Sequence, residues 1–168
     1  YTDTAPLFDT NNFQFKLVRD QYNSRFAITD PWNSELLWGN SSPVTNGQYW
    51  QIQSPAMMKD PTSSSVEASW QWLSPSLRMV ETYYTKNGLP ISEDLSFEYA
   101  DRYNPTNIDF NQRFYAQFAN RTAKLNLNRE ARFYAALGFD RGINRTWGSL
   151  WELKMRKGET HGLFLIHI

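Results

Sequence analysis

The sequence predicts an α+β fold that is irregular and has long loops, with few helices and with short antiparallel strands near the C-terminus. Apolar residues recur at helical spacing in three separate segments, whereas they alternate with other residues after residue 133. Between the first two segments, residues 39–73 are rich in Ser, Asn, Gly, Pro and Gln. A loop of that length usually carries function. The 168 residues suggest one domain, 1–168.

The first helix is expected over residues 13–26, because larger side chains recur there near helical spacing. These residues are Phe13, Leu17 and Tyr22, with Gln21 as the alternative to Tyr22. Asp30-Pro31 breaks the helix, since the residue before a proline is disfavoured in the α conformation. A short strand is then expected over residues 35–38.

The second helix is expected to begin at Ser74-Pro75. A serine caps the free N–H groups of a first turn, and proline fits the first helical position. Gly88 suits the left-handed residue that closes a helix. The residues that define the faces of this helix are Leu77, Val80, Glu81 and Tyr84.

The third helix is expected over residues 109–123. Phe110, Phe114 and Phe118 recur every four residues, which is typical of one helix face. Asp109 is favourable at the positive end of the helix dipole.

Three strands and a turn are expected in the last part of the chain. Residues 133–139 alternate in the manner of a half-buried strand, and Asp140-Arg141-Gly142 then turns the chain. A second strand is expected over residues 147–155, and a third over residues 163–168. No internal repeat is visible.

Three short segments carry a resemblance to a known family. They read NSELLW at residues 33–38, SLRMVETYYTKNGLPI at residues 76–91 and NREARFYAAL at residues 128–137. Together and in this order they resemble the SusD/RagB family of outer-membrane nutrient-binding lipoproteins. The family pattern usually has a proline where this chain has Ala131, and a proline there would fix the backbone.

The resemblance implies non-catalytic binding of an oligosaccharide or polysaccharide at the cell surface, beside a SusC-like TonB-dependent transporter of the outer membrane. Full-length relatives are longer, with a lipid-modified N-terminal cysteine and tetratricopeptide-type repeats. The chain resembles the C-terminal half outside those repeats. We therefore expect a part of a longer protein, which reaches the membrane only through an anchor outside this chain. For Arg129, Glu130 and Arg132 we expect a structural role, with glycan contact as the alternative.

Aromatic residues make up 16% of the chain, and this high content is the most unusual feature of its composition. Trp and Tyr offer a flat apolar face and a polar tip, and sugar rings have apolar C–H faces that stack on such surfaces. Aromatic residues with neighbouring amides inside the polar stretch are therefore the candidate ligand-binding residues. They are Tyr49, Trp50, Trp70 and Trp72, with Gln48 and Gln71. The alternative is that these tryptophans pin the loop to the core.

The same composition argues against other classes of function. Seventeen basic and seventeen acidic residues cancel, whereas a nucleic-acid partner requires a concentrated positive field. The sequence has no cysteine, no nucleophile elbow, no zinc-protease motif and no phosphate loop, so no metal or cofactor is expected. Two alternatives stay open. One is a glycoside hydrolase or carbohydrate-active accessory domain, which would need a carboxylate pair, and the other is a structural fragment that contacts the transporter only.

Overall fold

The computed structural model describes residues 13–29, 34, 37, 75–146, 149–157 and 159. The helices are α1 (Phe13–Thr29), α3 (Leu77–Glu81) and α4 (Ala131–Ala136). Short 3-10 helices are η2 (Tyr99–Asp101), η3 (Phe110–Gln112) and η4 (Lys124–Asn126). The strands are β1 (Pro105–Asn107), β2 (Arg121–Ala123), β3 (Ile143–Thr146) and β4 (Ser149–Glu152). The expected mixed α+β class is confirmed.

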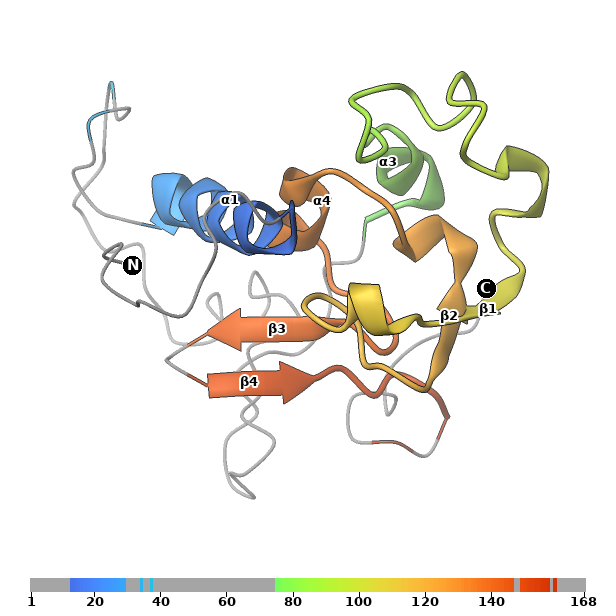
Figure 1. Ribbon diagram of the computed structural model, residues 1–168. Coiled ribbons are helices and arrows are strands. Elements are labelled where there is room, and N and C mark those ends of the chain that lie inside the picture. Colours follow the sequence, from blue (N-terminus) through green and yellow to red (C-terminus); the bar gives the residue numbers. More distant parts are fainter. Residues whose placement is uncertain are drawn as a thin grey trace.

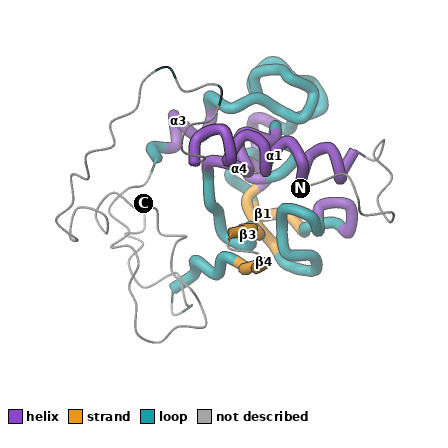
Figure 2. The backbone as a smooth tube through the Cα atoms, turned by 90° about the vertical axis from the view of Figure 1, so that its left-hand side faces the viewer, coloured by secondary structure: helices purple, strands orange, loops and turns teal. Residues whose placement is uncertain are grey.

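Two antiparallel strand pairs, β1–β2 and β3–β4, form the sheets of the described region. Helices α1 and α4 lie side by side on one side of the β3–β4 hairpin, as two perpendicular views agree (Figures 1 and 2). The pairing β3–β4 confirms the antiparallel strands expected late in the chain. Strand β4 falls inside the predicted strand 147–155, whereas β3 was not predicted.

Helix α1 confirms the helix predicted from residue 13, although it ends at Thr29 rather than at residue 26. Leu17 and Gln21 are buried, and Tyr22 is exposed. The side-chain amide of Gln21 donates a hydrogen bond to the carbonyl oxygen of Tyr134 at 2.8 Å. This bond attaches α1 to α4, which lies more than a hundred residues later.

The hydrophobic core is largely aromatic. The rings of Tyr115 and Tyr134 lie 4.2 Å apart between centroids, and Phe133 meets Tyr134 edge-on at 5.2 Å. Aromatic pairs of this kind stabilise a core beyond the area that they bury. The buried members of the cluster are Leu17, Ile108, Tyr115, Ala116, Leu127, Phe133, Tyr134 and Phe139.

The strand predicted over residues 133–139 is wrong, because residues 131–136 form α4. Phe133 and Tyr134 are both buried, and Leu137 packs against the same core. Leu137, the C-cap, follows Tyr134 by three positions and Phe133 by four, and these are the spacings that bring side chains to one side of a helix. The alternation that suggested a strand took Tyr134 for an outward-facing residue, whereas its hydroxyl is bonded within the core.

The predicted start of the second helix at Ser74 is also wrong. Helix α3 has Ser76 as its N-cap, and the Ser76 hydroxyl accepts from the backbone N–H of Met79 at 3.3 Å. The helix ends at Glu81, well before Gly88.

Gly88 closes a turn rather than a helix. Gly88 has φ +76°, and its N–H donates a hydrogen bond to the carbonyl oxygen of Thr85 at 2.9 Å. The Thr85 N–H in turn donates to the carbonyl oxygen of Leu89 at 2.9 Å. Tyr84 and Pro90 pair as an antiparallel bridge at the base of this turn.

The helix predicted over residues 109–123 is wrong. Only the 3-10 turn η3 forms near its start, and strand β2 occupies its end. The buried side chains of η3 and of the segment after it belong to Gln112, Tyr115 and Ala116, whereas Phe110 and Phe118 are exposed. The phenylalanine spacing therefore does not mark a buried helix face.

The turn predicted at Asp140-Arg141-Gly142 is confirmed, with Arg141 at φ +69° and a hydrogen bond from the Gly142 N–H to the Phe139 carbonyl oxygen at 2.9 Å. Leu37 lies in a bend, and the other residues of the strand predicted over residues 35–38 lie outside the described residues. The third predicted strand, 163–168, lies outside the described residues.

Candidate functional site

The six candidate ligand residues lie outside the described residues. They are Gln48, Tyr49, Trp50, Trp70, Gln71 and Trp72. The described residues form a buried polar framework and an exposed surface of their own.

Arg129 is the most deeply buried charged residue of the described region, with 1% of its surface exposed. Its Nη1 donates to the carbonyl oxygen of Leu125 at 2.8 Å. Its Nη2 donates to the carbonyl oxygens of Val80 and Tyr83 at 2.9 and 2.6 Å. The guanidinium carbon lies 4.6 Å from the centroid of the Phe133 ring. Burial lowers the pKa of Arg129, but a guanidinium titrates so far above neutrality that it stays charged.

Glu130 extends the same contact by binding the main chain of Tyr84. Its Oε1 accepts from the Tyr84 N–H at 2.9 Å, and its own N–H donates to the Tyr84 carbonyl oxygen at 3.1 Å. The other carboxylate oxygen pairs with Arg132 at 2.7 Å, and the Arg132 side chain is largely exposed. The structural role expected for this motif is confirmed: it holds the end of α3 and the segment after it.

Asp94 ties the turn around Gly88 to the chain that follows. Its Oδ2 accepts from the Thr85 hydroxyl at 2.5 Å and from the Asn87 amide at 2.9 Å. Its Oδ1 accepts from the N–H and the hydroxyl of Ser96 at 2.9 and 2.7 Å. These bonds, the one from Thr85 foremost, hold the pKa of Asp94 well below its usual value. A general acid of a glycosidase needs the opposite shift, so the surroundings of Asp94 fit a structural carboxylate.

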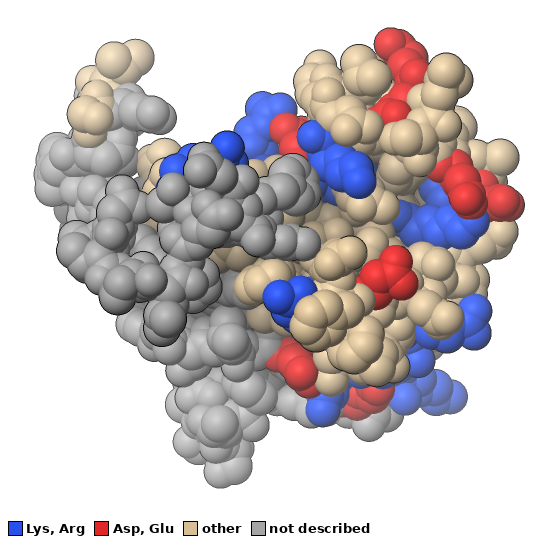
Figure 3. Space-filling view, viewed as in Figure 1, with Lys and Arg blue, Asp and Glu red and all other residues tan. Residues whose placement is uncertain are grey.

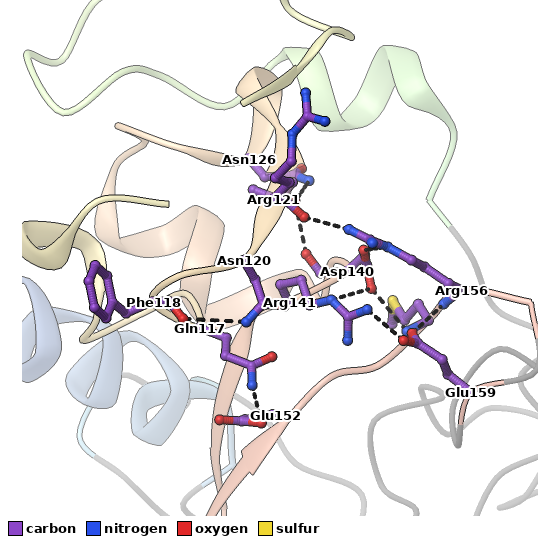
Figure 4. Close-up of polar contacts among 12 residues, drawn as sticks. Gln117, Phe118, Asn120, Arg121, Asn126, Asp140, Arg141, Glu152, Arg156 and Glu159 are labelled. Carbon is purple, nitrogen blue, oxygen red and sulfur yellow. Dashed lines mark hydrogen bonds and ion pairs between the residues drawn. The ribbon is translucent and has the colours of Figure 1, made fainter. Parts of the chain in front are cut away.

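A charged network joins the Asp140 turn to the segment after β4 (Figure 4). The side chain of buried Arg141 donates a hydrogen bond to Glu159 at 2.5 Å. The side chain of Arg156 donates one to Asp140 at 2.9 Å. The hydrogen bond from Arg141 lowers the pKa of Glu159. Opposite charges at these distances satisfy one another, so the network is structural.

Two groups of exposed aromatic side chains stand out on the described surface. In the first, Phe110 and Phe118 are 58% and 50% exposed and meet edge-on at 5.5 Å. The Arg113 guanidinium lies 3.9 Å from the Phe110 ring and 4.2 Å from the Phe114 ring. The sequence assigned these rings to a helix face, and their exposure was missed.

The second group lies where η2 meets α3. The Arg102 guanidinium carbon lies 4.1 Å from the Tyr99 ring and 4.4 Å from the Tyr103 ring. Glu81 accepts from the Tyr103 hydroxyl at 2.6 Å and forms an ion pair with Arg102. The hydrogen bond from Tyr103, followed by the one from Arg102, lowers the pKa of Glu81. The hydrogen bond between Tyr103 and Glu81 also raises the pKa of Tyr103. Both tyrosines lie in a polar stretch of the sequence, but that stretch alone does not single them out as a site.

A small cavity lies in the described core, away from the two aromatic groups. It measures about 10 Å³ and lies between α4 and the β3–β4 hairpin. This is room for about one water molecule, so a sugar ring does not fit there. Its lining residues include Arg25, Tyr115, Tyr134, Phe139 and Leu153. Acidic and basic side chains are intermingled over the described part of the face in Figure 3.

Comparison with known proteins adds one finding. A sequence model of the SusD family matches residues 34–161 of the chain. The match covers most of the chain and contains the buried motif, the Gly88 turn and both aromatic groups. No curated protein matches the chain.

Proposed function

The chain belongs to the SusD family, and we propose that it binds an oligosaccharide or polysaccharide at the cell surface without cleaving it. We further propose that it delivers this glycan to a SusC-like TonB-dependent transporter in the outer membrane. The observation that carries the proposal is the family match over residues 34–161, because members of this family are generally non-catalytic glycan-binding proteins of nutrient uptake.

Membrane association is proposed to depend on an anchor outside this chain. Within the part of the chain that the structure describes, no helix is both long enough and apolar enough to cross a bilayer. Location at the outer surface of the outer membrane follows from the family's usual role and belongs to the same proposal.

The proposed ligand contacts are the aromatic residues of the polar stretch and their neighbouring amides. Indole and phenol rings stack on the C–H faces of sugars, and amides bond the hydroxyls in both directions. The residues are Tyr49, Trp50, Trp70 and Trp72, with Gln48 and Gln71, and all lie inside the matched range.

The described frame supports this proposal physically. Arg129 spends its donors on main-chain carbonyl oxygens, and Glu130 fixes the segment that follows α3. A binding loop gains affinity and specificity when a rigid scaffold holds it, because less conformational entropy is lost on binding. We therefore propose that the family motif contributes indirectly, by stabilising the described part of the fold.

The proposal is tested by native affinity electrophoresis of the purified protein in gels that contain single polysaccharides. Reducing ends are measured in parallel. We expect at least one polysaccharide to retard the protein and to quench or shift its tryptophan fluorescence, with no release of reducing ends. Reducing ends that disappear after one carboxylate substitution would instead indicate a hydrolase. Absence of both retardation and fluorescence change across the panel would indicate a structural role at the transporter.

A further inference from the structure

Tyr99 and Tyr103, here called the tyrosine pair, are held rigid on the surface. They are 37% and 49% exposed, and the Arg102 guanidinium lies against both rings. Arg102 is itself fixed by the ion pair with Glu81 and by a hydrogen bond to the Tyr99 carbonyl oxygen at 3.0 Å. Cation–π contacts therefore preorganise the two rings before any ligand arrives, which lowers the entropic cost of binding.

The polar groups beside the tyrosine pair keep hydrogen-bonding capacity. Within the described residues, Glu81 accepts from Arg102 and Tyr103 through Oε1, which leaves the lone pairs of Oε2. A guanidinium carries five N–H donors, and Arg102 uses Nε and Nη1 for Glu81 and the Tyr99 carbonyl oxygen. The Arg102 and Glu81 side chains are 19% and 22% exposed, so solvent reaches both. A neighbouring donor and acceptor match two adjacent sugar hydroxyls.

The charges around the tyrosine pair select the chemical class of sugar. Lys124 pairs with Glu98 and lies 3.9 Å from Asp101. With Glu81 and Arg102, this surface carries three carboxylates and two cations, which leaves one net negative charge. Such a surface repels a uronate or a sulfated sugar and leaves a neutral sugar unaffected.

We infer that the tyrosine pair, together with Arg102 and Glu81, is a further contact site for a neutral oligosaccharide. One sugar ring stacks its C–H face on a solvent-facing tyrosine ring, and its adjacent hydroxyls bond the carboxylate and the guanidinium. The inference rests on the proposed function, because it adds a second contact region to the aromatic loop of residues 49–72.

The inference is tested by calorimetry with a neutral polysaccharide that the unsubstituted protein retains. The double variant Tyr99→Ala, Tyr103→Ala is expected to bind at least about fivefold more weakly, as expected for the loss of two stacking rings. The matched control is the double variant Phe110→Ala, Phe118→Ala, which removes two rings of similar exposure elsewhere on the surface. The control is expected to bind within about twofold of the unsubstituted protein.

Specificity provides a second readout. Neutral oligosaccharides are expected to compete for the unsubstituted protein, whereas uronate-rich oligosaccharides are not. If the double variant does not fold, Tyr99→Ala alone decides, with an expected loss of about two- to threefold.

The outcomes separate the inference from the function on which it rests. If the unsubstituted protein binds no polysaccharide, both fall. If it binds and the tyrosine variants bind equally well, only the further contact site is overturned. Equal weakening in the phenylalanine control, or competition by uronates as strong as by neutral sugars, overturns it as well.

Discussion

Glu130 and Tyr84 exchange two hydrogen bonds although they are 46 positions apart in the sequence. The next residues continue the pairing, since Thr85 and Arg129 form an antiparallel bridge and the Lys86 N–H donates to the Asn128 carbonyl oxygen at 2.8 Å. Two of the three segments that identify the family are thus in direct main-chain contact. The contact joins the chain after α3 to the segment that leads into α4.

Substitution of Arg129 by Lys is expected to lower the free energy of unfolding by about 3 kcal/mol. A lysine keeps the charge, but its single nitrogen cannot serve the set of carbonyl oxygens that the guanidinium fork reaches, and buried acceptors are left unsatisfied. Urea unfolding followed by tryptophan fluorescence measures the change. The control Arg132→Lys, at an exposed position of the same motif, is expected to change it by less than about 0.5 kcal/mol. Equal effects of the two substitutions would contradict the structural role of the motif.

Replacement of Asp94 by Asn is expected to destabilise the protein at neutral pH and to have less effect in acid. The folded-state pKa of Asp94 is depressed, so the unfolded chain binds the proton more readily. The stabilisation is therefore present above the ordinary carboxyl pKa of 3.8 and is lost as the pH falls below it. Urea midpoints of both proteins at pH 7, 4 and 3 test this. A difference that does not vary with pH would show that the carboxylate charge is not what stabilises the turn.

Substitution of Gly88 by Ala is expected to cost about 1 kcal/mol. At φ +76° the cost comes from the left-handed backbone alone, because an added Cβ meets no atom within 4 Å. Gly88→Asn, which tolerates this conformation better, is expected to cost less than Ala. Thermal unfolding by circular dichroism ranks the three proteins. A larger loss for Asn than for Ala would indicate a steric or hydrogen-bonding cause instead.

Sequence periodicity located the elements whose signals are local. Helix α1 has a buried face at Leu17 and Gln21, and the break at Asp30-Pro31 sets its end within a few residues. The turn at Asp140-Arg141-Gly142 is likewise a property of three adjacent residues. In these places the local sequence pattern was sufficient to predict the conformation, although distant contacts also stabilise it.

Periodicity failed where distant contacts decide. The helix predicted to close at Gly88 ends at Glu81, and the carbonyl oxygens of Val80 and Tyr83 just there bind Arg129, far along the chain. The strand predicted at Phe133 is a helix because Tyr134 turns inward and its hydroxyl bonds the core main chain. Neither partner is visible from the local pattern.

The site residues likewise divide into those that the sequence predicted and those that only the structure reveals. A structural role for Arg129 and Glu130 was predicted from the sequence and is confirmed by their contacts. The ligand role of the loop aromatics, Trp50 among them, stays a prediction. Tyr99 and Tyr103 were overlooked, because what distinguishes them is the Arg102 guanidinium that contacts both rings, and only the folded chain shows that arrangement.

The most direct test of glycan capture compares the unsubstituted protein with the triple variant Trp50→Ala, Trp70→Ala, Trp72→Ala by affinity electrophoresis on the retained polysaccharide. Reducing ends are assayed in the same samples, and circular dichroism confirms that both proteins are folded. We expect the unsubstituted protein to be retarded, the variant to bind at least about tenfold more weakly, and neither to release reducing ends. Unchanged binding by the folded variant, or release of reducing ends by the unsubstituted protein, would contradict capture by the aromatic loop.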